Sequence, residues 1–422
     1  MSPVMVPAAV PLHEFATRHR GISIVSYNVL LPNSQDGWWV FKYYDASTPD
    51  RAREWPHRQD LLRTTLLGAM ADVVCVQEAS GATFSADFGF MLEAGYGAAL
   101  HRKYRLRPAT FWRADAWRCI HERHRDKVLI CVLQSVAEPA VTISVLNCHL
   151  VAAPLPERRF RQVFDALEQL RKDLTRLHIS PAQAAVVVAG DFNAAPEGTA
   201  THHLLCGGVV DADFRELRWP ERSLSSKPRR HGFAPFTEAY LHTLGRAPVT
   251  LLGSRVAGLL DADGQPTATL MGAISALFDR FAAGERMDWT AVEAWLMRIN
   301  RAVDRGSESH KARAVVAAKG ERWLSRAELV GLYADELAEG KFWSVLHDLQ
   351  ACGVLPAGER TLFAAALDRI YASNLAVLAA WDPLPAARRR ALFSGGIGLP
   401  NDWHPSDHLP IGAVLGWPTR GG

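Results

Sequence analysis

Short runs of β-branched and other apolar residues recur through the first half of the chain. Such runs, bounded by turn residues, predict buried strands at residues 21–30, 71–79, 109–117, 127–136, 140–151 and 184–193. Between them, apolar residues recur at helical spacing over 58–71 and over 156–177, where Pro156 and Glu157 suit a first helical turn. This mixture predicts an α/β or α+β sandwich whose helices cover the outer faces.

The pattern changes after this half of the chain. From about residue 255 to 357 apolar residues recur only at helical spacing, and strand-like sequence resumes at 366–381. We therefore predict a sandwich domain built from residues 1–254 and 358–422, interrupted by an all-helical insertion at 255–357.

Composition narrows the class of protein. The 422 residues are 48% hydrophobic and 22% charged, which is typical of a globular protein, and the formal charge of +3 is nearly neutral for this length. Nothing in the total charge argues for nucleic acid, so a polyanion would need local clusters such as 101–107 or 227–231. A solvated surface is the equal alternative for such clusters.

The cysteines and the N-terminus bear on location. No CxxC spacing is present, and most cysteines lie in apolar, strand-like stretches, so we expect reduced core thiols and a cytoplasmic protein. Prolines interrupt residues 1–15, which argues against a secretory signal, and no stretch is long and apolar enough to predict a membrane span.

Polar side chains of a matching kind follow several predicted strands. Each alone is typical of a cap or turn, but so many in one chain are hard to attribute to turns. In chain order they are Asn28, Glu78, His149, Asp191, Asn193, Asp407 and His408. The carboxyl ends of strands are where sheet-based enzymes hold ligands, so these residues are candidate site residues.

These residue types suggest a chemistry. Glu78 is a hard oxygen ligand suited to Mg²⁺ or Mn²⁺, whereas no Cys/His spacing suits zinc. His149 and His408 could stabilise charge on a phosphorane-like transition state or protonate a leaving oxygen, and Asp191 could orient or deprotonate a water. Together they predict metal-assisted phosphoester hydrolysis.

The motifs at these residues resemble a known family. "SYNVL", "VQE", "NCHL", "GDFN" and "SDH", in this order, are similar to those of the endonuclease/exonuclease/phosphatase superfamily, with its deoxyribonuclease-like four-layer α/β sandwich. Residues 398–410, 366–373 and Trp55 with Arg58 resemble the deadenylase and nocturnin branch. The resemblance covers about residues 20–250 and 361–417.

The resemblance implies a role for each residue. Glu78 would hold the metal, with Asp407 close to it and Asn28 contacting metal-bound water or phosphate. Asp191 would position the attacking water, while the scissile phosphate would be bound by Asn193, His149 and His408. Asp368 would orient His408, the alternative being a surface acid on a helix. Arg58 would be a further phosphate contact or a plain surface arginine.

Two features depart from that branch. Residues 33–45 are rich in aromatics for a loop, which could stack a base or form a hydrophobic lid on the core. In addition, about a hundred helical residues precede the strand that carries Asp368.

The insertion resembles degenerate EF-hand pairs, as in plant-type members of the superfamily described as calcium-binding. Asp261, Asp263 and Gln265 begin like a calcium loop, but Pro266 replaces the turn glycine and Gly272 replaces the closing glutamate. Two later helix–loop–helix segments lack the acids, although the second keeps Glu328. We therefore favour a metal-free bundle without functional Ca²⁺ binding, which is a candidate surface for a protein partner.

Three functions are compatible with these observations. The first is an Mg²⁺- or Mn²⁺-dependent phosphodiesterase acting on RNA or oligonucleotides as a deadenylase-like 3′ exonuclease. The second is a small-molecule phosphatase or phosphodiesterase acting on a nucleotide, a lipid headgroup or a metabolite, because the fold and metal site are shared by all of these. The third is a non-catalytic scaffold, which the retained metal and phosphate residues disfavour.

Overall fold

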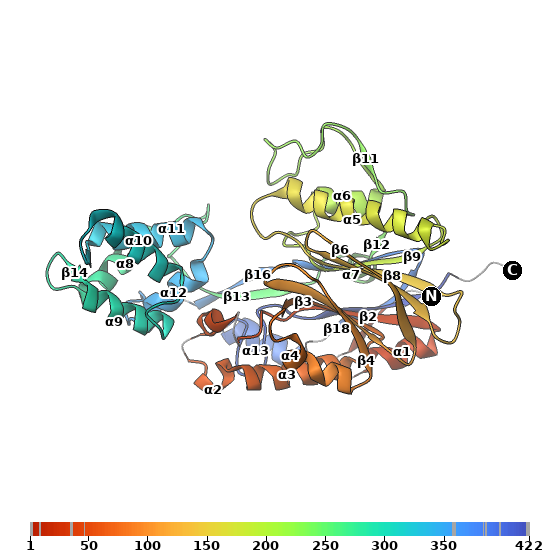
Figure 1. The fold of residues 1–422 in the computed structure, drawn as a ribbon, viewed down its shortest axis with the longest axis horizontal. Helices are drawn as coiled ribbons and strands as arrows, with labels where there is room; N and C mark the ends of the chain where they lie inside the picture. Colours follow the sequence, from red (N-terminus) through yellow and green to blue (C-terminus); the bar gives the residue numbers. More distant parts are fainter. Residues whose placement is uncertain are drawn as a thin grey trace.

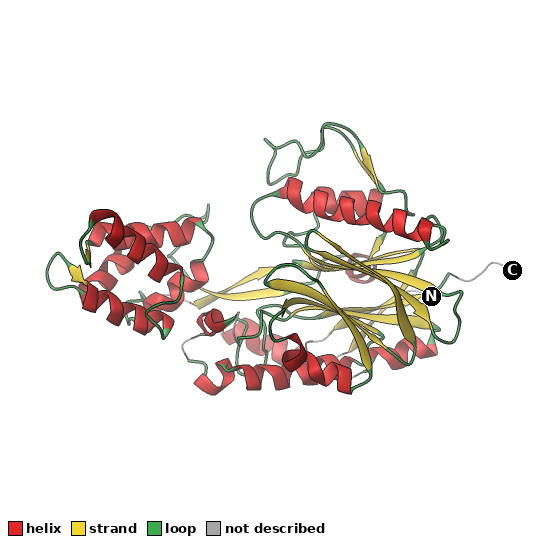
Figure 2. Ribbon diagram, viewed as in Figure 1, coloured by secondary structure: helices red, strands yellow, loops and turns green. Residues whose placement is uncertain are grey.

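Two mixed β-sheets packed face to face form the body of the protein (Figures 1 and 2). The computed structural model describes residues 3–7, 10–33, 37–45, 47–356, 360–382, 384, 386–395 and 398–418. The first sheet has the order β1 (Val4–Pro7), β18 (Ala376–Asp382), β19 (Ile411–Gly416), β2 (Gly21–Asn28), β3 (Val73–Ser80), β5 (Leu106–Arg113), β4 (Tyr96–Leu100). The second has the order β12 (Thr237–Glu238), β17 (Asp368–Ser373), β9 (Ala185–Asp191), β8 (Thr142–His149), β7 (Val128–Ser135), β6 (Trp117–Arg125).

Helices cover both outer faces, so the body has four layers (Figure 2). The first sheet is covered by α1 (Leu12–Arg18), α3 (Trp55–Ala69) and α4 (Phe84–Glu93), and the second by α5 (Pro156–Arg176) and α6 (Ala200–Gly207). The smaller elements are η1 (Trp38–Tyr43), α2 (Asp50–Arg53), β10 (Val209–Val210), β11 (Arg229–Arg230), α7 (Ala239–Leu244) and α13 (Ala386–Gly395). The predicted four-layer α/β sandwich is confirmed.

Alternation along the strands explains why their sequences are almost continuously apolar. On β2, Ile22 and Ile24 pack in the core between the sheets, whereas Val25 and Tyr27 pack under the helices with Leu62 of α3. Both faces are therefore removed from water, which is what a run of consecutive apolar residues predicts.

Two predicted strands were placed inexactly. The predicted run 109–117 spans a turn, because β5 ends at Arg113 and β6 begins at Trp117. Likewise, 366–381 holds two strands, β17 and β18, separated at Asn374, which has a φ of 54°. Asn is one of the residues that tolerates this left-handed conformation, and it turns the chain from one sheet to the other.

A two-stranded ribbon leads from the body to the helical insertion (Figure 1). It consists of β13 (Leu251–Val256) and β16 (Arg360–Ala365). The insertion contains α8 (Ala268–Phe281), β14 (Met287–Asp288), α9 (Trp289–Asn300), α10 (Ser307–Lys319), β15 (Trp323–Leu324), α11 (Arg326–Ala338) and α12 (Phe342–Ala351). The predicted first boundary, 254/255, thus falls inside β13, and the second, 357/358, lies outside the described residues.

The insertion contains two helix–turn–helix units, α8–α9 and α10–α11, whose turns pair through β14 and β15. The loop of Asp261 precedes α8, and the Asp261 carboxylate accepts the backbone N–H groups of Asp263 and Gln265. Glu328 forms a capping box with Ser325 at the start of α11 and pairs with Lys319. Asp261 and Glu328 thus both have structural roles, at a turn and at a helix start. The EF-hand resemblance stays a prediction.

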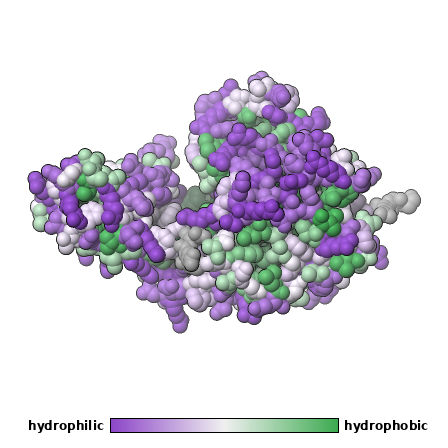
Figure 3. Space-filling view, viewed as in Figure 1, coloured by the Kyte–Doolittle hydropathy of each residue, from purple (hydrophilic) through white to green (hydrophobic). Residues whose placement is uncertain are grey.

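The six cysteines are free thiols, and four of them are buried. Among the described residues, no helix has the length and apolar character needed to cross a bilayer. Hydrophilic residues dominate the visible face of the insertion and of the helices over the second sheet (Figure 3).

A buried ion-pair network fixes the insertion to the body. The ammonium group of Lys42, on η1, lies 3.1 Å from carboxylate oxygens of Glu308 and Asp348 in the insertion and donates to Ser344 at 3.3 Å. The side chains of Lys42 and Glu308 are 3% exposed and that of Asp348 is fully buried, so water cannot replace any partner.

We predict that Lys42→Met lowers the free energy of unfolding by about 3–5 kcal/mol, because it leaves two buried carboxylates without their cation. Urea denaturation followed by tryptophan fluorescence measures the change. The control is Arg18→Ala, which removes an exposed ion pair with Glu14 and changes stability by less than about 1 kcal/mol. Equal effects of the two substitutions would contradict the assignment of Lys42 as the anchor.

Candidate functional site

Strand register brings the predicted residues together at one edge of the sandwich. β2 and β3 are parallel in the first sheet, and β8 and β9 are parallel in the second, so each pair ends on the same side. His149 and Asp191 are directly paired across β8 and β9, and Asp368 pairs with Asp191 from β17. Residues that are far apart in the chain therefore meet because of the register of five strands.

The side-chain amide of Asn28 joins the two sheets. It donates to Glu78 Oε1 at 3.2 Å and to Asp191 Oδ2 at 3.0 Å, while its oxygen accepts the N–H of Leu30 at 3.1 Å. Asn28 is 1% exposed. One amide thus fixes the distance between the carboxylates of two different sheets.

A β-bulge aims Glu78. The register of β3 with β5 shifts between Val76 and Ala79, and Glu78 has a φ of 68°. Bulges commonly re-aim a side chain next to an active site. Here the bulge directs Glu78 toward Asn28, and its Oε2 accepts the N–H of Leu31 at 3.1 Å.

Asp368 and His408 form a buried pair. His408 Nδ1 lies 2.7 Å from Asp368 Oδ2, and Asp368 is fully buried. Burial alone would lower the pKa of His408, but the charges of Asp368 and Asp407 raise it well above its ordinary value. His408 is therefore held as a cation, with Nε2 3.9 Å from Asp191 Oδ2.

The insertion ribbon positions this pair. Thr250, just before β13, accepts the backbone N–H of Asp368 at 3.1 Å through its hydroxyl. Leu251 bridges to His408, and the N–H of Leu252 donates to Asp407 O at 3.1 Å. The start of the insertion thus holds both the strand of Asp368 and the loop of Asp407 and His408 in place. No sequence motif predicted this role for Thr250.

Burial and charge shift the other ionisable groups. Burial raises the pKa of Asp191 to about 7, with His408 opposing the shift and Asp368 adding to it. Burial also raises the pKa of Asp407 to about 6, with His408 opposing and Glu78 adding to the shift. For His149, burial lowers the pKa to about 4, so this imidazole is neutral near pH 7. The site therefore concentrates buried carboxylates whose charged forms need a cation.

The donor set fits a hard divalent cation. Glu78, Asp407 and the Asn28 amide offer oxygen atoms, and Mg²⁺ typically binds one or two carboxylates and completes its shell with waters and phosphate oxygens. The described part of the chain has no group of three or more His, Cys, Asp or Glu side chains arranged to hold a metal. This donor set suits Mg²⁺ or Mn²⁺ with an open shell better than a closed protein cage.

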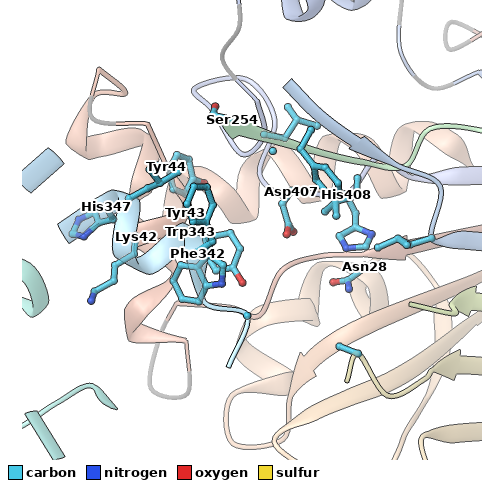
Figure 4. A pocket seen from close by; sticks show the side chains of 18 of the residues that line it. Asn28, Lys42, Tyr43, Tyr44, Ser254, Phe342, Trp343, His347, Asp407 and His408 are labelled. Atoms are coloured by element: carbon cyan, nitrogen blue, oxygen red, sulfur yellow. The ribbon is translucent and has the colours of Figure 1, made fainter. Parts of the chain in front are cut away.

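These residues line one cavity of about 510 Å³. The predicted residues that line it are Asn28, Glu78, His149, Asp191, Asn193, Asp407 and His408. Asp368 is connected to the cavity through His408, whose Nδ1 it contacts. Figure 4 shows Asn28, Asp407 and His408 on one side of the cavity and aromatic side chains on the other.

Asn193 is held beside Asp191 at the end of β9. It has a φ of 50°, its N–H donates to Asp191 Oδ1 at 2.8 Å, and its side-chain amide donates to Leu150 O at 3.0 Å. The left-handed backbone thus turns the chain under Asp191 and places Asn193 at the cavity wall.

The predicted phosphate contact of Arg58 requires a correction. Arg58 is fully buried on α3, and its guanidinium donates to the carbonyl groups of Val29, Leu30, Leu31 and Pro405 and to the side chain of Asn33. All its donors are used inside the protein. Arg58 therefore ties the loop after Asn28 to the loop before Asp407, and it is neither a phosphate ligand nor a surface residue.

The aromatic segment 33–45 packs against the insertion. Trp39 and Tyr43 contact Trp343 of α12, while Tyr43 and Tyr44 line the cavity. The predicted lid and the predicted stacking surface are thus both compatible with this segment, whose residues 34–36 lie outside the described part. The contribution of α12 to the cavity was not predicted, because amphipathic spacing does not reveal which neighbour a helix meets.

The chain is similar in sequence to several known proteins. The chain is 28% identical over 231 residues to rat (Rattus norvegicus) 2',5'-phosphodiesterase 12, covering 46% of this chain and 37% of that protein. It is 23% identical over 292 residues to the CCR4-Not complex 3'-5'-exoribonuclease subunit Ccr4 of Debaryomyces hansenii, covering 59% and 34%. The chain thus spans less than two fifths of the length of either relative.

The fold has solved counterparts. The crystal structure of ANGEL2, a 2',3'-cyclic phosphatase, superposes with a TM-score of 0.53 at 16% identity, covering 94% of this chain and 95% of that one. The model of the Endonuclease/Exonuclease/phosphatase family matches residues 25–408. The chain therefore belongs to the endonuclease/exonuclease/phosphatase family.

Proposed function

We propose that this protein is a divalent-metal-dependent phosphodiesterase that hydrolyses RNA or short oligonucleotides from the 3′ end. The observation that carries the proposal is the convergence of a carboxylate pair, two imidazoles and Asp191 on the wall of one cavity. Metal-assisted phosphoester hydrolysis needs these groups in one place.

The metal would be Mg²⁺ or Mn²⁺, held by Glu78 and Asp407 with Asn28 close by. When bound, it would neutralise charge on the phosphate oxygens. The remaining steps belong to the protein. Asn193, neutral His149 and cationic His408 would bind the scissile phosphate through hydrogen bonds, and Asp368 would keep His408 charged and oriented.

Asp191 would orient the attacking water. As the water oxygen bonds to phosphorus, its proton passes to Asp191 and the bond from phosphorus to the leaving oxygen breaks. The leaving oxygen then takes a proton from His408 or from solvent. A carboxylate whose pKa burial raises to about 7 suits such a proton acceptor near neutral pH.

The substrate is the least constrained part of the proposal. Leu106 lines the cavity, and its neighbours Arg105 and Arg107 belong to the basic segment 101–107, which we propose follows the phosphate backbone of a longer substrate. The similarity to a 2',5'-phosphodiesterase and to an exoribonuclease subunit supports an RNA-like substrate.

A small-molecule phosphate ester, such as a nucleotide, a lipid headgroup or a metabolite, is the second candidate. The total charge of +3 and a cavity closed on one side by α12 favour it. A cytoplasmic location and a protein partner for the insertion stay predictions.

We expect Glu78→Gln to lower kcat/KM by about 100-fold or more, since several kcal/mol of charge stabilisation depend on a bound metal. Calorimetry should show weaker Mn²⁺ binding by the same variant. Glu138→Gln, an exposed residue in the turn between β7 and β8, is the matched control and should change neither quantity. Unchanged Mn²⁺ affinity in Glu78→Gln would refute the metal assignment, and no turnover of any phosphate ester by the wild type would favour the scaffold.

Asp368→Asn should lower kcat by about 100- to 10,000-fold, because His408 then loses the negative charge that keeps it cationic and correctly oriented. The double variant Asp368→Asn/His408→Ala should be no slower than His408→Ala alone, since the two residues act as one unit. Asp115→Asn, at an exposed carboxylate, is the control. Additive losses in the double variant would show that Asp368 acts on stability and not through His408.

Salt separates the two substrate classes. If an RNA strand follows the basic segment, KM for an oligoadenylate of about twelve nucleotides should rise with salt more steeply than KM for one of about three nucleotides. Each extra phosphate contacted should add about −0.7 to the slope of log affinity against log salt concentration. Arg105→Ala should make the steeper slope shallower by the amount expected for about one phosphate contact. Equal slopes for the two lengths would favour the small-molecule phosphate ester.

A further inference from the structure

Helix α12 of the insertion forms a wall of the catalytic cavity. Its lining residues are Phe342, Trp343, Leu346, His347 and Gln350. Figure 4 shows Phe342, Trp343 and Tyr43 gathered on the side of the cavity opposite Asp407 and His408. A segment that lies outside the sandwich in sequence therefore completes the place where substrate must bind.

Several contacts hold this wall in position. The Trp343 ring stacks on Tyr43 with centroids 4.1 Å apart, and it lies 5.5 Å from Trp39. One turn further, His347 meets Phe41 edge-on at 5.4 Å. Together with the buried Lys42 network, these contacts make α12 a fixed part of the cavity.

The wall also lies close to the catalytic carboxylates. Burial raises the pKa of Tyr43 well above its ordinary value, and the charges of Asp407 and Glu78 add to this shift. Tyr43 in turn stacks on Trp343. Tyr43 and Trp343 line the same cavity as Glu78 and Asp407, so the aromatic surface faces the proposed metal and phosphate positions (Figure 4).

The chemistry of the wall matches a nucleobase. Its aromatic rings offer flat, apolar faces, while Gln350 and Ser254 add polar groups that can pair with the edge of a base. The volume of about 510 Å³ is in the range of cavities that hold small ligands.

We propose that α12 binds the base of the nucleotide whose phosphate lies at His149 and His408, with Phe342 stacking on that base. The insertion is then a substrate-specificity element of the active site. This inference rests on the proposed phosphodiesterase function and adds the position and the source of base recognition.

Phe342 is the residue to test: it is partly buried against the core of the insertion, whereas Trp343 joins α12 to Trp39 and Tyr43 of the body, so that its removal would disturb the docking of the insertion. The substrates are adenylyl-adenosine and the same dinucleotide with either base removed. Stacking on an aromatic ring contributes about 1–3 kcal/mol, which corresponds to about 5- to 150-fold in affinity. Phe342→Ala should therefore lower kcat/KM for adenylyl-adenosine by at least about fivefold and leave that for one abasic dinucleotide unchanged.

Phe342→Trp should restore the preference for the intact dinucleotide. Phe393→Ala, at an exposed phenylalanine of α13, is the matched control and should leave both substrates unaffected. Equal losses on intact and abasic dinucleotides, or a wild type that does not distinguish them, would overturn the inference while leaving the proposed function in place.

A binding measurement separates the two proposals. Adenosine monophosphate should quench tryptophan fluorescence in the wild type, because Trp343 lies in the wall, and Phe342→Ala should raise the apparent Kd at least about fivefold. If the wild type binds the nucleotide in this way but hydrolyses no dinucleotide, the proposed function fails and base binding stands. If no quenching occurs while dinucleotides are hydrolysed, base binding at α12 fails alone.

Discussion

The hydrogen bonds of the Asn28 amide to Glu78 and Asp191 are the constraint on which the site depends, because they join two sheets between which no strands pair among the described residues. A second link lies beneath them in the core, where Gln77 donates to Asn147 at 2.8 Å. Buried polar groups in a core are tolerated only when each finds a partner. These links thus convert sheet packing into a fixed separation of the catalytic carboxylates.

The insertion is coupled to the same site at two points. Its ribbon holds Asp368 and the loop of Asp407 through Thr250 and Leu252, and its last helix forms the cavity wall. Arg58 adds a third restraint by tying the loop after Asn28 to Pro405. Residues that contact no substrate therefore decide how accurately the acids and imidazoles meet, since small displacements of catalytic groups are costly.

Periodicity and motifs were sufficient to predict the sandwich and the residues of its rim. Strand-end positions such as His149 and Asp191 could be identified because burial on both faces gives apolar runs that stop abruptly at polar residues. β6 was missed because it is an edge strand with mostly half-buried and polar side chains, so it gives no such run. The role of Arg58 was predicted wrongly because a sequence does not reveal whether a long cationic side chain reaches solvent or donates its hydrogen bonds to the carbonyl groups of buried loops.

The docking of the insertion depends on long-range contacts that local patterns do not contain. Lys42 is an ordinary charged residue within an aromatic segment, and only its pairing with Glu308 and Asp348 shows that this segment is an interface. We propose that the reacting groups come from the sandwich and that α12 of the insertion supplies the base-binding wall, so that chemistry and substrate choice would reside on different parts of the chain. Similarity of fold constrains the chemistry of the site but leaves the choice of substrate open. On this proposal, the residues of α12 are where specificity would change without disturbing the strand register that assembles the acids and imidazoles.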